Sequence, residues 1–154
     1  MNKKYRIWGV CIGIVLLLII ITPRIHRHVR REEGRIIPKV TVTDQIKAVP
    51  NDDIKALLRS HSKATVIILN VQNTKLNQKF DQFINQNQNL NLSQTIYIFQ
   101  ELYHDKLIAK LNLDKTAINV VQFEGGKSTA IYPVTSKTAF DQSLVDQLKK
   151  LSAN

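Results

Sequence analysis

One stretch, Thr65 to Ile84, constrains the fold of this chain more than any other. Residues 65–71 read Thr-Val-Ile-Ile-Leu-Asn-Val, a run that is apolar on both faces of an extended chain and typical of a strand covered on two sides. Four polar residues, 72–75, follow this run. In residues 76–84 the apolar side chains recur at helical spacing, at Leu76, Phe80, Phe83 and Ile84. The pattern predicts a central strand, a turn and an amphipathic helix that packs on the sheet.

The turn between this strand and helix is the first place to look for chemistry. In an open α/β sheet, ligands and catalytic groups usually lie just after a central strand. This turn contributes only Asn73, Thr74 and Lys75, and it contains no cysteine, histidine or carboxylate. The sequence therefore predicts no catalytic residue here, and we do not expect an enzyme.

Length and charge limit the domain organisation and the partners. The 154 residues suffice for one globular domain beside an apolar segment. The net charge is +10, yet residues 1–39 hold nine Lys and Arg against two Glu, whereas residues 40–154 hold thirteen against ten acids. A nucleic-acid binder normally carries its charge on the folded domain, interleaved with aromatic side chains. We therefore expect no nucleic acid as partner, and instead expect membrane phosphates to attract the excess charge.

The basic segment surrounds an uncharged stretch, Ile7 to Thr22. As a helix it would span about 24 Å, which reaches across a bilayer core once flanking basic side chains snorkel. A cleaved signal peptide would have the same basic leader, but no Ala-x-Ala-like cleavage site follows Ile21. We expect a leader and single-pass anchor at 1–23, a basic juxtamembrane stalk at 24–39 and a folded domain at 40–154.

Two rules disagree on the side of the membrane where the domain lies. Six Arg and Lys follow the anchor and three precede it, and this bias favours a cytoplasmic domain. A short basic leader before an apolar run is, however, typical of an anchor whose N-terminus stays inside. We expect the domain outside the cell membrane, with the opposite orientation as the alternative.

Cysteine and histidine usage excludes several kinds of site. Cys11 is the only cysteine and lies in the apolar stretch, which rules out an intrachain disulfide and a multi-cysteine metal site. His26 and His28 form a pair without a third ligand nearby. We expect neither a metal nor a cofactor.

The remaining elements are predicted from periodicity and turn residues. Strands are expected at 40–43, 95–99, 118–123 and 128–132, and the last two form a hairpin around Gly125-Gly126. Helices are expected from Pro50 to about Leu58 with Asn51 as N-cap, at 102–111 with His104 near its start, and at 138–151. Residues 85–94 are expected to form a polar surface loop.

The resulting order, β-α-β-α-β-α-β-β-α, resembles the thioredoxin fold over residues 40–151. The most specific pieces are residues 66–84 and 120–127, whose Phe-Glu-Gly-Gly-Lys is similar to the turn after the family's fourth strand. The resemblance implies an α/β fold with a mixed sheet flanked by helices, here preceded by one transmembrane helix. Among such proteins, the chain is similar to the small anchored accessory type found beside bacteriocin export systems of Gram-positive bacteria.

The chain departs from the family at the two positions that carry its chemistry. Where the family has Cys-x-x-Cys, this chain has Asn73, Thr74, Lys75 and Leu76. The family's cis-proline corresponds to Ile118 or a neighbour, and no proline occurs between Pro50 and Pro133. Because thiol-disulfide exchange needs an attacking thiolate and a resolving thiol, the resemblance implies the fold without the activity.

Three functions remain open at this point. The first is a redox-inactive accessory module that presents Asn73, Thr74, Lys75 and Leu76, or a sheet edge, to a protein or peptide. The second is an oxidoreductase relative that acts only with a partner's cysteines. The third is a tethered structural subunit of a membrane complex.

Overall fold

The computed structural model describes residues 40–103 and 105–153 together with ten residues nearer the N-terminus, at positions 12, 15, 19, 21, 22, 24, 25, 28, 29 and 32. The chain divides into two compact units, Met1–Pro38 and Lys39–Asn154. The ten described residues of the first unit are helical. No helix among the described residues is long and apolar enough to cross a bilayer. Most of the expected anchor and stalk, with Cys11 and His26, lies outside the described residues.

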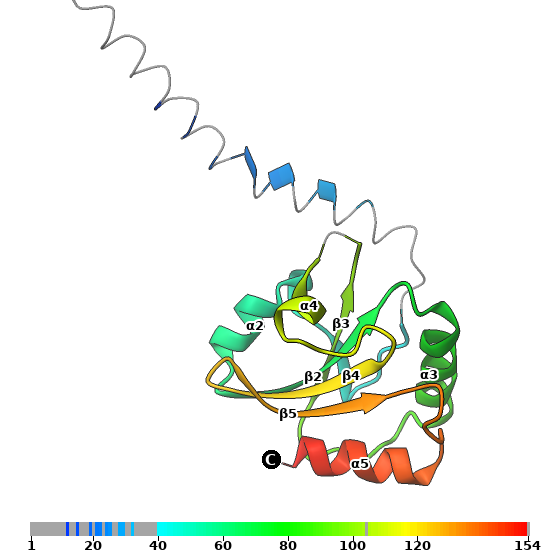
Figure 1. Ribbon diagram of the computed structural model, residues 1–154. Helices are drawn as coiled ribbons and strands as arrows, with labels where there is room; N and C mark the ends of the chain where they lie inside the picture. The colour runs from blue at the N-terminus through cyan, green and yellow to red at the C-terminus, as the bar shows by residue number, and fades with distance from the viewer. Residues whose placement is uncertain are drawn as a thin grey trace, which may run out of the picture. The chain divides into compact units, whose positions relative to one another are not determined.

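The second unit contains the expected alternation of strands and helices (Figure 1). Its strands are β1 (Ile46–Ala48), β2 (Lys63–Asn70), β3 (Ile96–Glu101), β4 (Ile118–Glu124) and β5 (Lys127–Val134). Its helices are the 3-10 turn η1 (Pro50–Asp52), α2 (Ile54–Ser60), α3 (Thr74–Gln86), α4 (Leu107–Lys110) and α5 (Gln142–Ser152). The order of elements is the one that the sequence predicts.

The five strands form one mixed sheet in the order β1-β3-β2-β4-β5. Strands β1, β3 and β2 run parallel, and β4 and β5 are antiparallel to their neighbours. The predicted central strand is confirmed, because β2 lies in the middle of the sheet and residues 64–69 are buried without interruption.

Helices cover both faces of the sheet, so two apolar cores form. On one face, α3 and α5 pack on the strands, and the cluster includes Phe80, Ile84 and Leu148. On the other face, α2 and α4 contribute Ile54, Leu57 and Ile108. Figure 1 shows α2 and α5 on opposite sides of the strands. The predicted apolar stripe of α3 is confirmed, since Leu76, Phe80, Phe83 and Ile84 are all buried.

The β4–β5 hairpin is also confirmed. Gly125 and Gly126 have φ angles of 57° and 78°, the positive values that a two-residue hairpin turn requires and that side chains beyond glycine rarely adopt. A bulge between Gln122 and Phe123 shifts the register, so that Gln122 pairs with Ala130 and Phe123 with Ser128.

The predicted first strand is wrong. Residues 40–43 are irregular, and the strand begins at Ile46, where the register with Ile96 starts. The hydroxyl of Thr43 accepts a hydrogen bond from the N–H of Ile46, and the N–H of Thr41 donates to Asp81. The threonines that suggested a strand therefore form a turn and a loop contact instead.

Three helix boundaries also differ from the prediction. Asn51 lies in η1 with a φ of 54°, and Asp53 is the N-cap of α2, accepting from the N–H of Ala56 at 3.0 Å. The helix expected at 102–111 is reduced to the four residues of α4. Helix α5 begins only after its N-cap Asp141, so Phe140 packs on the core from outside the helix.

Candidate functional site

The start of α3 lies beyond the carboxyl end of the central strand β2, where the sequence analysis placed the candidate residues. Asn73 is the N-cap residue, and Thr74 and Lys75 are exposed in the first turn. Leu76 is only 7% exposed and belongs to the core under the helix. The structure thus places Thr74 and Lys75 at the surface and turns Leu76 inward.

The side chain of Asn73 does not cap its own helix. Its amide Nδ2 donates to the carbonyl of Lys115 at 2.8 Å, and Nδ2 of Asn70 donates to the same carbonyl at 3.2 Å. Lys115 lies in the loop 112–117 that leads into β4. Two amides from the end of β2 and the start of α3 therefore hold this loop against the helix.

The side chain of a third asparagine also binds this loop. Asn119 in β4 is fully buried, and its Nδ2 donates to the carbonyls of Asp114 at 2.8 Å and Ala117 at 3.3 Å. Asp114 in turn accepts from the N–H and the hydroxyl of Thr116, and the hydroxyl in particular holds the pKa of the Asp114 carboxyl below its usual value. Side chains from two strands and a helix start thus fix the conformation of residues 114–117, which we call the clamped loop.

Two buried amide oxygens have no hydrogen-bond partner among the described residues. They are Oδ1 of Asn119 and Oδ1 of Asn77, whose Nδ2 donates to the carbonyl of Asn70 at 2.8 Å.

The sequence analysis did not identify Asn70, Asn119 or the clamped loop as parts of the site. A signal existed for Asn119, because an amide between Ile118 and Val120 interrupts an otherwise apolar strand. Its partners could not be found from spacing, since Asp114 and Ala117 lie in a loop without periodic pattern.

The chemistry of this end of the domain consists of amides, hydroxyls and two ammonium groups. Thr74, Lys75, Lys115 and Thr116 are exposed, and the described residues here include no thiol. These groups can donate hydrogen bonds and attract negative charge. They cannot attack or resolve a disulfide, because that exchange requires thiolates.

Other candidate features of the sequence do not join this site. The described residues contain no group of three His, Cys, Asp or Glu side chains placed to hold a metal ion, and no cis peptide bond. His104 lies outside the described residues. A small cavity at the opposite end of the sheet is lined by residues including Lys63, Gln122 and Glu124, and Lys63 and Glu124 form an ion pair at 3.6 Å. It is far in the fold from the start of α3, because it lies at the other end of β2.

No family model matches the chain, and no curated protein matches its sequence. Among solved structures, the J-Trx1 fragment of ERdj5 superposes with a TM-score of 0.46 and 12% sequence identity, over 71% of this chain and 53% of that fragment. The chain therefore spans about half the length of that structure. The described residues contain the order of elements and the central strand of a mixed sheet that the resemblance implied for residues 40–151.

Proposed function

We propose that the chain is a membrane-anchored, redox-inactive thioredoxin-like module that binds a protein or peptide through the start of α3 and the clamped loop. The observation that carries this proposal is the bond from Asn73 to the carbonyl of Lys115. It puts an amide with a structural role at the position where the fold family begins its thiol chemistry. Binding without redox turnover is the function that such an end of the fold supports best.

Two further features support a binding role. Exposed polar side chains on a loop held by a rigid scaffold are a common form of recognition site. Here Thr74 and Lys75 from α3 lie in the same end of the domain as Lys115 and Thr116 from the clamped loop. A loop that is already fixed loses little conformational entropy when a partner binds.

The experiment that tests the binding role uses the full chain in its native membrane. A photo-reactive amino acid replaces Thr74 in one variant and Ser128, exposed in β5 at the opposite end of β4, in the control. We expect a discrete cross-linked protein or peptide with the first variant and none with the second. Equal labelling from both positions, or labelling from Ser128 only, would contradict a site at the start of α3.

We propose that the domain is tethered outside the cytoplasmic membrane by residues 7–22. The basic leader Lys3, Lys4 and Arg6 favours this orientation, and anionic lipid head groups would hold the arginines that follow the anchor. Protease added to intact cells without a wall should digest the domain. Digestion only after the membrane is permeabilised would mean that the domain faces the cytoplasm and that the partner must be sought there.

The resemblance to anchored accessory proteins of bacteriocin export supplies the proposed setting, the handling of an exported peptide. The alternatives are a relative of thiol oxidoreductases that uses a partner's cysteines and a structural subunit of a membrane complex. Neighbouring genes distinguish them. Export and immunity genes would favour the accessory role, and a thiol-disulfide reductase gene would favour the first alternative.

A further inference from the structure

The folded unit carries unequal charges at the two ends of its sheet. The parallel strands begin at one end, which also holds the turn of the β4–β5 hairpin and the last turns of α2 and α5. We call it the basic end because of its six basic side chains: Lys47, Arg59, Lys63, Lys127, Lys149 and Lys150. The acidic side chains of the basic end are Asp44 and Glu124, so that six positive and two negative groups give a formal charge of +4.

The end that holds the candidate site has the opposite balance. Its basic side chains are Lys75, Lys106, Lys110, Lys115 and Lys137, five in number. Its acidic side chains are Asp52, Asp53, Glu101, Asp105, Asp114 and Asp141, and six negative against five positive groups give a formal charge of −1. The two ends are separated by the length of β2, about 25 Å for a strand of this length, whereas salt screens charges beyond about 8 Å. A charged surface in contact with the basic end is therefore screened from the acids at the candidate site.

Sheet register brings two of the basic side chains together. Glu124 of β4 pairs with Lys63 of β2 on one side and with Lys127 of β5 on the other. The Nζ of Lys63 lies 3.6 Å from Oε1 of Glu124, yet 53% of the Lys63 side chain is exposed. One carboxylate thus lies between two exposed ammonium groups and can neutralise only one of them.

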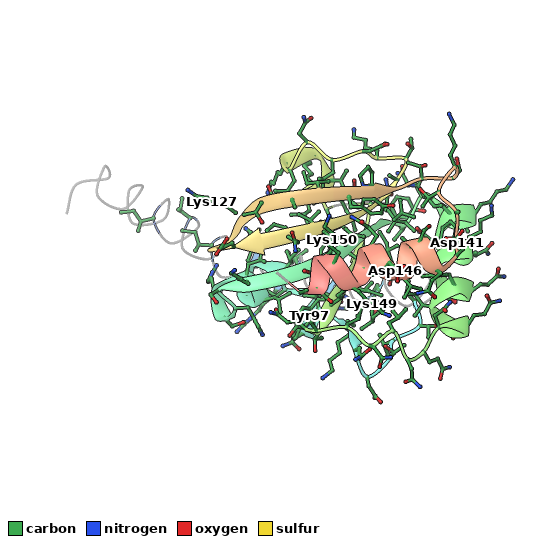
Figure 2. All side chains as sticks on the ribbon, turned by 90° about the horizontal axis from the view of Figure 1, so that it is seen from below. Tyr97, Lys127, Asp141, Asp146, Lys149 and Lys150 are labelled. Carbon is green, nitrogen blue, oxygen red and sulfur yellow. The ribbon has the colours of Figure 1, made fainter. Side chains whose placement is uncertain are left out.

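Hydrogen bonds hold the last turn of α5 at the same end. The carbonyl of Leu151 accepts from the hydroxyl of Thr65 at 2.8 Å and from Nε2 of Gln122 at 2.7 Å. Thr65 and Gln122 lie in the parts of β2 and β4 that adjoin the basic end. Figure 2 shows Lys149 and Lys150 on the half of α5 that is nearer to the tip of the hairpin. Basic groups from the strands and from α5 therefore share one end of the domain.

Helix dipoles explain part of this positive charge. Arg59 lies in the last turn of α2 and two lysines lie in the last turn of α5, where they offset the partial negative charge of a helix C-terminus. Lys47, Lys63 and Lys127 lie on strands, which have only small dipoles, and all three are exposed. These three lysines do not serve a helix end, and a partner outside the domain accounts for them better.

We propose that the basic end binds the anionic head groups of the bilayer. Lys and Arg near an anionic membrane surface are each attracted to it. Nucleic acid fits less well, because Tyr97, the aromatic residue beside His61 at this end, is half-buried and its hydroxyl lies 3.3 Å from Nε2 of His61, so it offers no free face for a base. The proposal rests on the proposed anchor, since residues 24–39 span no more than about 55 Å and keep the bilayer at a high effective concentration. The candidate site then faces away from the lipid.

Fluorescence quenching by labelled lipid tests this contact. The full chain with Cys11→Ser is reconstituted in nanodiscs whose lipids carry nitroxide quenchers on their head groups. A fluorophore is attached at Ser128→Cys, beside the basic end, or at Thr74→Cys, at the candidate site. We expect several-fold stronger quenching at position 128 in phosphatidylglycerol-rich discs than in phosphatidylcholine discs, and weak quenching at position 74 in both. Equal quenching at position 128 in the two lipids, or stronger quenching at position 74, would overturn the proposal.

Charge variants identify the groups that make the contact. Lys127→Gln/Lys150→Gln should reduce quenching at position 128 several-fold in the anionic discs. Lys106→Gln/Lys110→Gln, which removes the same charge from the other end, is the matched control and should leave it unchanged. An equal loss in both variants would overturn the proposal.

A third variant changes the charge in the other direction. Glu124→Gln raises the formal charge of the basic end and should strengthen quenching, a gain that damage to the fold would not produce. A decrease in this variant would contradict the contact. The outcome is separate from the binding role: failed docking with successful cross-linking at Thr74 would keep the candidate site, and the reverse would keep only the orientation of the domain.

Discussion

The Nδ2 atom of Asn73 lies 2.8 Å from the carbonyl oxygen of Lys115, a residue 42 positions further along the chain. This bond joins the start of α3 to the loop before β4, the two segments that form the candidate site. The side-chain oxygen of an N-cap asparagine normally accepts a hydrogen bond from an N–H of its own helix. The Asn73 side chain makes no such bond, and its Nδ2 donates to the clamped loop instead, which is why we assign that loop and the helix start to one candidate site.

The first prediction concerns this bond. Asn73→Ala should lower the free energy of unfolding by about 1 kcal/mol, because one hydrogen bond is lost while Asn70 still donates to Lys115. Amide exchange in the clamped loop should accelerate more than exchange in β2. Urea denaturation and hydrogen exchange measure the two effects. Gln78→Ala, on the exposed face of α3, is the matched control and should change neither. An unchanged loop in Asn73→Ala would mean that Asn70 and Asn119 suffice to hold it.

The second prediction concerns the missing thiols. The wild-type chain should not reduce insulin disulfides, because its only cysteine, Cys11, lies in the expected anchor. Asn73→Cys/Leu76→Cys places two thiols at the N-cap and the third residue of α3. This variant should gain measurable reductase activity when dithiothreitol reduces its cysteine pair between turnovers. The single variant Asn73→Cys is the control and should form mixed disulfides without turnover. Turnover by the wild-type chain would disprove redox inactivity.

The parts of the fold that could be predicted are those where local pattern and tertiary environment agree. Val66 to Leu69 are apolar on both faces and are buried on both faces. Gly125-Gly126 supplies the positive φ angles that the two-residue turn between β4 and β5 adopts. In each case the residues of the segment determine its conformation without a distant partner.

The prediction failed where a distant partner decides the conformation. Residues 40–43 have the β-branched side chains of a strand, yet Asp81 of α3 binds the N–H of Thr41, and pairing with β3 begins at Ile46. Likewise Asn51 looks like an N-cap, but Asp53 performs that role. The candidate site also depends on a distant partner. The sequence located Asn73, whereas its partner Lys115 became visible only in the folded chain.

The third prediction concerns association through the sheet edge. Strand β5 lies at the edge of the sheet, and its Ile131 is 48% exposed. Its first residue is the charged Lys127, and Pro133 near its end has no backbone N–H to donate to a further strand. Charge and proline are the usual protection of an exposed edge. Residues 40–154 alone should therefore fold and stay monomeric. Lys127→Thr/Pro133→Val should form dimers or larger species at high concentration in analytical ultracentrifugation. Ile131→Val, which changes no backbone donor, is the control and should remain monomeric.

The last prediction concerns acid stability and Asp141, the N-cap of α5, which Figure 2 shows at one end of the helix that carries Asp146. The hydroxyl and the N–H of Ser143 donate to the Asp141 carboxylate at 2.5 and 2.9 Å, and these bonds lower the pKa of Asp141 in the folded state. A lowered pKa means that the unfolded chain binds more protons, so this stabilisation is complete above the ordinary aspartate pKa of about 3.9. It is lost as the pH falls through the lower folded value.

Asp141→Ala should therefore reduce the free energy of unfolding at neutral pH, and its difference from the wild type should shrink below roughly pH 3. Urea denaturation between pH 7 and pH 2.5 measures this. Asp146→Ala is the matched control, because Asp146 accepts from the side chain of Gln142 at 2.9 Å rather than from a helix N–H. It leaves the helix start intact and should cost less at neutral pH. If Asp141→Ala lost the same free energy at both ends of the pH range, the aspartate would stabilise α5 by a contact that does not depend on its charge.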